Sequence, residues 1–152
     1  MITLKRILFP TDFSPQADKA REYAYSLAEK FDAELHIVCV VQDVALMAPE
    51  MPGTFAMPIT NLDEVVKAAE QSLHRYPACA GKAPVRVVRT GEPFVEIIRY
   101  AKERNIDLIV LGTHGRTGLT HVLLGSVAER VVRKAGCPVL TVRPEGHQFV
   151  MP

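Results

Sequence analysis

Three glycines follow a short apolar run in the C-terminal half of the chain. The run at 108–111, LIVL, ends at Gly112 and is typical of a strand buried on both faces. Gly112, Gly115 and Gly118 mark a loop, and a helical pattern begins at 125–126, GS. Glycines let backbone N–H groups approach a ligand, and a helix start offers unpaired N–H groups with about half a positive charge. This order predicts an anion site, usually one for phosphate.

The same glycines are equally compatible with a tight turn and an ordinary capped helix. Ser126 is a good N-cap, and Glu129 three residues later completes a capping box. The spacing is neither the G-x-G-x-x-G dinucleotide fingerprint nor a Walker A loop, which needs Gly-Lys-Ser/Thr. The pattern that remains is G-x2-G-x9-G-S.

That pattern resembles the motif of the universal stress protein family, in particular its ATP-binding class, G-x2-G-x9-G-S/T. Residues 7–14, ILFPTDFS, resemble the family's opening strand and turn, and residues 137–142, CPVLTV, resemble its closing strand. The resemblance covers residues 4–144, nearly the whole chain. It implies a Rossmann-like fold of the adenine nucleotide alpha hydrolase type, with sheet order 3-2-1-4-5.

The resemblance also implies an adenine-nucleotide site, for ATP or alternatively AMP or ADP. Gly112 and Gly115 would surround the ribose and phosphates. Gly125, Ser126 and the Val127 N–H would hold the phosphates. Further contacts are expected at the strand ends, from Pro10, Thr11, Val41 and Leu111. The backbone of Val41 is expected to contact the adenine. Ala128 departs from some nucleotide-binding relatives, which have a threonine there, so one hydroxyl contact is expected to be missing.

Asp12 stands at the carboxyl end of the first predicted strand, where open α/β sheets bind ligands. From the residues alone a turn-capping role is favoured, whereas the resemblance favours contact near the ribose and phosphates. A carboxylate repels phosphates unless a cation intervenes, so we expect Mg²⁺ or Mn²⁺ with the nucleotide and Asp12 as an indirect ligand. Arg116 is expected to neutralise the phosphates, with a solvated arginine as the equal alternative. His114 and His121, seven residues apart, lack the partners of a protein metal site.

Strands and helices alternate along the chain, which predicts an α/β doubly wound parallel sheet of five strands with four helices. Strands are expected at 6–10, 34–41, 85–90, 108–111 and 139–142. Helices are expected to begin after the N-caps Ser14, Asn61 and Ser126, and the third helix is expected to open at 91–93, GEP. Their expected core faces include Phe31, Val65, Ile98 and Val132. The third strand, which alternates with arginines, is expected at a sheet edge.

Three segments are expected at the surface of the domain: a loop, the C-terminal tail and an edge strand. Residues 43–60 hold prolines and methionines and predict a flexible loop, either a surface insertion or a lid over the nucleotide. Residues 145–152 predict a frayed tail. Val139, Leu140 and Val142 predict an apolar edge strand. A bare edge invites pairing, so we expect a homodimer through 139–142, with a covered edge in a monomer as the alternative.

Composition bounds the remaining possibilities. The 152 residues fit one domain, 1–152, and a net charge of +1 gives no reason to propose nucleic acid or membrane as partners. We expect no signal peptide or membrane span. Three separated cysteines favour a reducing, cytoplasmic location. Cys79, in a predicted loop, is expected to be exposed.

These observations leave three functions open. The first is an ATP-binding sensor or switch in the stress response, read by an unknown downstream protein. The second is a slow Mg-dependent ATPase; no nucleophile–base pair and no water-activating residue stands out. The third is a dimeric interaction or chaperone-like module that binds no nucleotide, against which the intact G-x2-G-x9-G-S argues.

Overall fold

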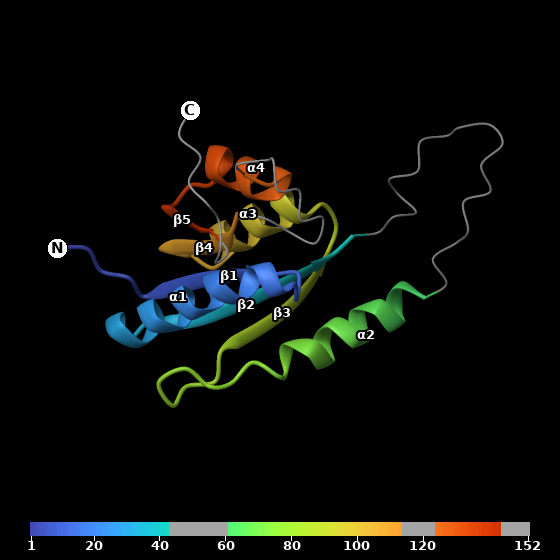
Figure 1. Cartoon of the computed structure of the whole chain (residues 1–152), viewed down its shortest axis with the longest axis horizontal. Helices are drawn as coiled ribbons and strands as arrows, with labels where there is room; N and C mark the ends of the chain where they lie inside the picture. Colours follow the sequence, from blue (N-terminus) through green and yellow to red (C-terminus); the bar gives the residue numbers. More distant parts are fainter. Residues whose placement is uncertain (43–60, 114–123, 144–152) are drawn as a thin grey trace.

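The computed structural model describes residues 1–42, 61–113 and 124–143 (Figure 1). Strands and helices alternate through these residues. The strands are β1 (Arg6–Thr11), β2 (Glu34–Val41), β3 (Val85–Thr90), β4 (Leu108–Gly112) and β5 (Val139–Val142). The helices are α1 (Pro15–Phe31), α2 (Leu62–Leu73), α3 (Pro93–Glu103) and α4 (Ser126–Lys134). The predicted loop at 43–60 and tail at 145–152 lie outside the described residues.

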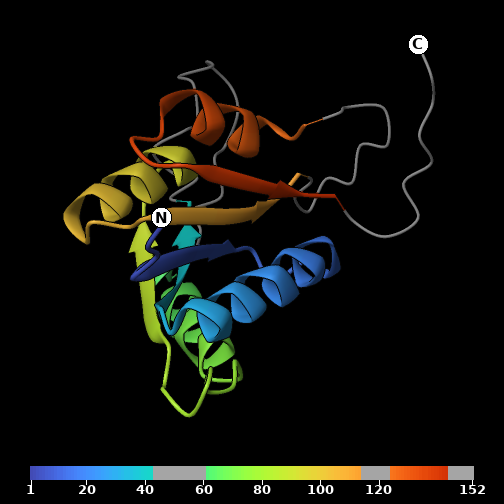
Figure 2. The same ribbon diagram turned by 90° about the vertical axis from the view of Figure 1, so that its left-hand side faces the viewer.

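The strands form one sheet in the order β3-β2-β1-β4-β5, and every neighbouring pair is parallel. The predicted fold class and strand order are therefore confirmed. Figures 1 and 2 show α1 and α2 on one face of the sheet and α3 and α4 on the other. Because helices cover both faces, the central strands must be apolar on both sides.

Alternate residues of the strands build two separate cores. In β1, Ile7 and Phe9 pack on the side of α1 and α2, while Leu8 packs on the side of α3 and α4; all three are fully buried. This follows from the two-residue period of a strand. The helices complete the cores with small or branched side chains: Ala20, Ala24 and Leu73 on the first side, and Ile97, Ala128 and Val131 on the second.

The helix starts differ in detail from the predictions. Gly125, not Ser126, is the N-cap of α4, and no side-chain hydrogen bond caps the helix. The Glu129 N–H donates to the Gly125 carbonyl at 2.9 Å, so the predicted Ser126–Glu129 capping box is wrong. Ser14 and Asn61 are N-caps as predicted, but neither side chain caps its helix.

Three apolar side chains expected in the core lie on the surface. Val65 is 43% exposed, Val132 45% and Phe31 39%. Each occupies the border of its helix's apolar stripe, where a helical period alone does not decide which side chain the sheet covers. Conversely, Tyr100 and Glu96 of α3 are buried, and neither was predicted.

Two further expectations were wrong. β1 was predicted to end at Pro10 but continues to Thr11, and Pro10 stands opposite Val38 of β2. Proline is tolerated within a strand where one side is unpaired, and the pairing of β1 with β4 ends before Pro10. Cys79 is buried, with its Sγ 3.6 Å from the carbonyl of Tyr25. Among the described helices, none has the length and apolar character needed to cross a membrane.

Candidate functional site

The sheet opens between its two central strands. β1 pairs with β4 through Ile7↔Leu108 and Leu8↔Ile109 only. Beyond these pairs β1 remains on β2 as far as Thr11, and β4 remains on β5 as far as Gly112. Strand order reverses at this point, and doubly wound sheets bind ligands outside the carboxyl ends of the strands there.

The β1 side of this opening is the turn that carries Asp12. The Ser14 N–H donates to Asp12 Oδ1 at 2.9 Å, so Asp12 has the turn-capping role that the residues alone favoured. The Phe13 N–H donates to Thr11 Oγ1 at 3.0 Å, and the Tyr76 hydroxyl lies 3.0 Å from the same oxygen. The Thr11 side chain thus faces the core, and the turn is anchored from two directions.

The turn also contains a polar atom without a partner. Ser14 Oγ is buried and has no hydrogen-bond partner. Ser14 precedes Pro15, the first residue of α1. A buried hydroxyl is normally hydrogen-bonded, so this oxygen gives the turn an unsatisfied polar group next to the first residue of α1.

The β4 side leads to the start of α4. The Thr113 N–H donates to the Val142 carbonyl at 3.0 Å, and the Gly125 N–H donates to the Thr113 carbonyl at 2.5 Å. This pairing places the N-cap of α4 beside the end of β4. Ser126 is exposed and Val127 half-buried in the first helical turn. The first N–H groups of a helix have no partner within it, and Gly125 has no side chain to cap them.

The other predicted contacts divide into two groups. Val41 and Leu111 are buried in opposite cores, so a ligand would meet their backbone rather than their side chains. The Val41 carbonyl accepts a hydrogen bond from the Gly91 N–H at 2.9 Å. Gly115 and Arg116, together with residues 114 and 121, lie outside the described residues.

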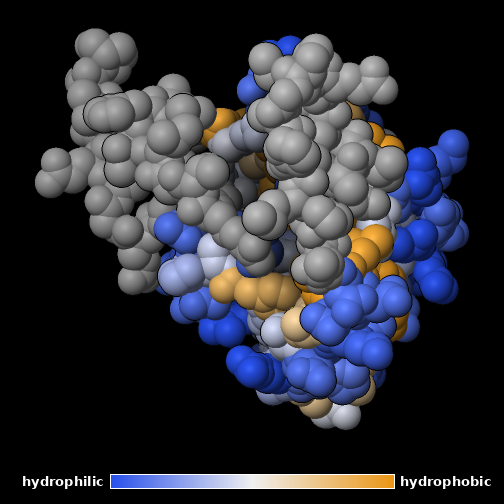
Figure 3. Space-filling model, turned by 90° about the vertical axis from the view of Figure 1, so that its right-hand side faces the viewer, coloured by the Kyte–Doolittle hydropathy of each residue, from blue (hydrophilic) through white to orange (hydrophobic). Residues whose placement is uncertain are grey.

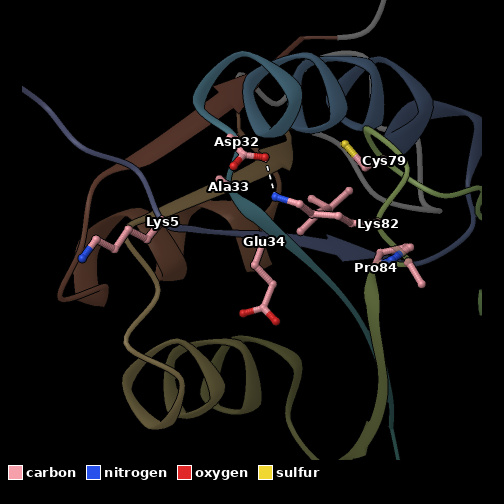
Figure 4. A pocket seen from close by; sticks show the side chains of 9 residues that line it. Lys5, Asp32, Ala33, Glu34, Cys79, Lys82 and Pro84 are labelled. Atoms are coloured by element: carbon pink, nitrogen blue, oxygen red, sulfur yellow. Dashed lines mark hydrogen bonds and ion pairs between the residues drawn. The ribbon is translucent and has the colours of Figure 1, made fainter.

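Figure 3 views the molecule from the side toward which β2 runs, where apolar patches lie between larger polar surfaces. Two pockets lined by described residues lie at the opposite, amino ends of the strands. One is lined by Lys5, Glu34, Cys79 and their neighbours, and the other by Arg6, His36, Arg104 and theirs. In Figure 4 the Lys82–Asp32 ion pair spans the first, while the Lys5 and Glu34 side chains point away from it. Neither pocket contains a predicted site residue, and an exposed ion pair is weak evidence for a ligand.

Residues that could do chemistry are sparse in the described ranges. No group of three His, Cys, Asp or Glu side chains within 1–42, 61–113 and 124–143 could hold a metal ion. Burial raises the pKa of the Tyr76 hydroxyl, and the hydrogen bond with Thr11 opposes that shift. Tyr76 therefore remains a neutral hydrogen-bonding group. The sequence analysis missed it, although an aromatic residue before Pro77 at a helix end was a signal that it packs inward.

The predicted dimer strand occupies a sheet edge. β5 pairs with β4 on one side, and the order β3-β2-β1-β4-β5 leaves its other side unpaired within the described residues. Val142 is buried, whereas Val139 and Leu140 are half-buried, with Val139 on the α4 side and Leu140 on the α1 side. The edge is therefore less bare than its composition indicated.

A parallel sheet in this strand order, with an opening at the point where the order reverses, defines a doubly wound, Rossmann-like α/β domain. The profile of the Universal stress protein family matches residues 3–143. The chain is 36% identical over 143 residues to Universal stress protein MJ0531 of Methanocaldococcus jannaschii, covering 91% of this chain and 82% of that protein. The solved structure of UspA from Lactobacillus plantarum superimposes with a TM-score of 0.72 at 28% identity, and the match covers 94% of this chain and 100% of that one. The chain belongs to the universal stress protein family.

Two more distant solved structures carry nucleotides. A universal stress protein in complex with cAMP has a TM-score of 0.66 at 23% identity, covering 95% of this chain and all of that one. A universal stress protein of Archaeoglobus fulgidus in complex with dAMP has a TM-score of 0.54 at 22% identity, and the match covers 94% of this chain and 100% of that one. At these identities the two structures establish the shared fold.

Proposed function

We propose that this protein binds an adenine nucleotide, ATP in the first instance, and acts as a nucleotide-dependent switch in the stress response. The observation that carries the proposal is that β1 and β4 stop pairing after Leu8 and Ile109, whereas each strand stays paired with its other neighbour as far as Thr11 and Gly112. The relatives solved with cAMP and dAMP support an adenine nucleotide as the class of ligand. We take ATP first, before AMP or ADP, because the G-x2-G-x9-G-S spacing resembles that of the family's ATP-binding class.

The described residues fit such a ligand. The first turn of α4 supplies backbone N–H donors and the positive end of the helix dipole for phosphates. The Ser14 hydroxyl supplies a buried polar group without a partner. Asp12 uses Oδ1 to hold its own turn, and its carboxylate would face a divalent cation bound with the phosphates. A bound Mg²⁺ or Mn²⁺ would supply charge neutralisation.

A switch rather than an ATPase is the function we favour. The Asp12 carboxylate accepts the Ser14 N–H and is therefore engaged in holding the turn, whereas water activation needs a base within hydrogen-bond reach of the water. A downstream protein would read the occupied state. We further propose a homodimer through β5, supported by its unpaired edge.

The direct test is a thermal melt of the nucleotide-stripped protein with and without ATP and Mg²⁺. ATP at a hundred times its dissociation constant should add about 2.7 kcal/mol to the unfolding free energy. For a domain of this size the melting temperature should rise by roughly 5 to 10 °C. Gly125→Val should remove the rise, because it places a branched side chain at the N-cap of α4. No rise in the wild-type protein at millimolar ATP would contradict nucleotide binding.

A further inference from the structure

The turn between β1 and α1 has an unusual backbone. Phe13 has φ of +61°, in the left-handed region that bulky residues rarely adopt. Such a conformation is unfavourable for a residue with a Cβ and persists only where neighbouring groups hold it. It lies directly between Asp12 and Ser14, so the position of Asp12 depends on whatever holds Phe13.

Tyr76 contacts this turn in two ways. Its hydroxyl lies 3.0 Å from Thr11 Oγ1, the oxygen that accepts the Phe13 N–H. Its ring stacks on the Phe13 ring, with centroids 6.3 Å apart and planes 28° apart. Tyr76 also meets Phe9 edge-on, with centroids 6.1 Å apart, and the Arg21 guanidinium lies 5.8 Å from its ring centre. A buried side chain with these neighbours has little freedom to move.

Tyr76 is distant from the turn in sequence. It follows α2, the helix that comes after residues 43–60, and is separated from Thr11 by 65 positions. The local bonds of the turn connect residues two positions apart, from Phe13 to Thr11 and from Ser14 to Asp12. Short-range bonds can form in several backbone conformations, whereas a stacked ring from elsewhere in the fold selects one.

We propose that Tyr76 is a positioning residue for nucleotide binding, which acts through Thr11 and Phe13 to hold Asp12 in place. This rests on the proposed function, since it assigns the binding geometry of the same site. Removing the hydroxyl leaves Thr11 Oγ1 with the Phe13 N–H alone. The Tyr76 ring still stacks on Phe13, but the Thr11 side chain that accepts the Phe13 N–H is held by one bond fewer, so the turn loosens and Asp12 is held less firmly beside the opening between β1 and β4.

The chain offers a matched control in Tyr25. Its hydroxyl donates to the Pro77 carbonyl at 2.9 Å, one residue from Tyr76, without contacting the turn. Tyr76→Phe and Tyr25→Phe thus each remove one hydroxyl hydrogen bond from the same segment. Isothermal titration with MgATP should give a dissociation constant about fivefold weaker for Tyr76→Phe, the effect of one hydrogen bond. Tyr25→Phe should bind like the wild-type protein.

Two measurements separate positioning from general loosening. Without nucleotide, NMR hydrogen exchange of the Phe13 amide should be faster in Tyr76→Phe and unchanged in Tyr25→Phe. In a double-mutant cycle, Tyr76→Phe should weaken ATP binding little further once Thr11→Val is present, because the tyrosine acts through that threonine. Circular dichroism checks that every variant is folded. If Tyr76→Phe is not, Thr11→Val removes the same hydrogen bond from the other side and should weaken ATP binding in its place.

The outcomes are distinguishable. Wild-type affinity in Tyr76→Phe, or an equal loss in Tyr76→Phe and Tyr25→Phe, would overturn the role of Tyr76 while leaving nucleotide binding intact. Additive losses with Thr11→Val would overturn the proposed route through Thr11. Failure of the wild-type protein to bind ATP would overturn the proposed function, and the positioning role with it.

Discussion

Nδ1 of His36 lies 2.8 Å from the hydroxyl of Tyr100, and both side chains are buried between β2 and α3. Nε2 of His36 lies 3.1 Å from Glu34 Oε2. A carboxylate accepts hydrogen bonds, so Nε2 carries the proton of the neutral ring and Nδ1 accepts from Tyr100. One partner of His36 lies two residues before it in β2, and the other lies in α3, 64 positions along the chain.

This arrangement predicts a loss of stability in mild acid. Burial lowers the pKa of His36 below 6.5, with Arg104 and Arg6 acting in the same direction and Glu34 opposing them. The unfolded chain therefore takes up the proton first as the pH falls. The stability contributed by neutral His36 is complete above pH 6.5 and declines toward the lower folded-state pKa, with a slope of at most about 1.4 kcal/mol per pH unit.

Urea unfolding between pH 7.5 and 5.5 measures that slope. His36→Gln should flatten it, because the variant has no imidazole to protonate. His74→Gln removes an exposed histidine at the end of α2 and serves as the control. An identical slope in His36→Gln and the wild-type protein would contradict the prediction.

Gly91→Ala should destabilise the protein by about 1–3 kcal/mol. Gly91 has φ of +144°, and an added Cβ would lie 3.2 Å from Cγ of the buried Glu96. The Gly91 N–H also donates to the Val41 carbonyl, so the backbone cannot easily move away. Thermal or urea unfolding measures the change.

Gly136→Ala is the matched control for Gly91→Ala. An added Cβ there meets no heavy atom within 4 Å, and its φ lies outside the left-handed region. Alanine should be neutral or slightly stabilising, because it reduces the freedom of the unfolded chain. Equal effects of the two substitutions would show that the contact with Glu96 is not the cause.

Asp12→Asn should reduce the Mg²⁺ dependence of ATP binding. An asparagine oxygen can still accept the Ser14 N–H, so the turn is retained while the negative charge is lost. Removing the repulsion should strengthen metal-free ATP binding by about fivefold, the effect of roughly 1 kcal/mol between exposed charges. Titrations with Mg²⁺ and with EDTA measure this.

Asp18→Asn supplies the comparison for Asp12→Asn. Asp18 is an exposed residue of α1 that pairs with Arg21 at 3.4 Å. Removing the charge of Asp18 should leave the affinity for ATP unchanged, both with Mg²⁺ and with EDTA. Equal weakening of ATP binding by Asp12→Asn with and without Mg²⁺ would argue against a cation beside Asp12.

Thr141→Pro should convert the proposed dimer into a monomer without unfolding it. The carbonyls of Pro138 and Val142 accept from β4, so strand alternation directs the N–H of Thr141 toward the free edge. Proline removes that donor and is tolerated on an edge strand. Sedimentation equilibrium of wild type and variant measures the mass.

Val132→Lys distinguishes the β5 edge from other surfaces in the same experiment. Val132 is an exposed apolar residue of α4 and lies outside the sheet. A monomeric wild-type protein, or a dimer lost in Val132→Lys but kept in Thr141→Pro, would contradict pairing through β5.

Much of the fold could be predicted from the sequence because its determinants are local. The apolar runs at 34–41 and 139–142 and the change to helical spacing between strands are read directly from the residues, and these strands have the predicted bounds. Helix starts were placed within one residue, because Pro15 and Pro93 favour the first helical position. The capping interaction of α4 was not, since the backbone conformation that makes Gly125 rather than Ser126 the N-cap depends on the neighbouring elements.

By itself, the sequence determined the class of sheet, the positions of its strands and the residues at which a nucleotide site is expected. These depend on patterns a few residues long. The tertiary structure decided which groups meet: Tyr76 with Thr11, His36 with Tyr100, and Glu96 against Gly91. The first two contacts join residues 65 and 64 positions apart, which meet only when the segments that follow β2 pack on the sheet. No periodicity of a single element contains that information, because packing selects among side chains that each element presents equally well.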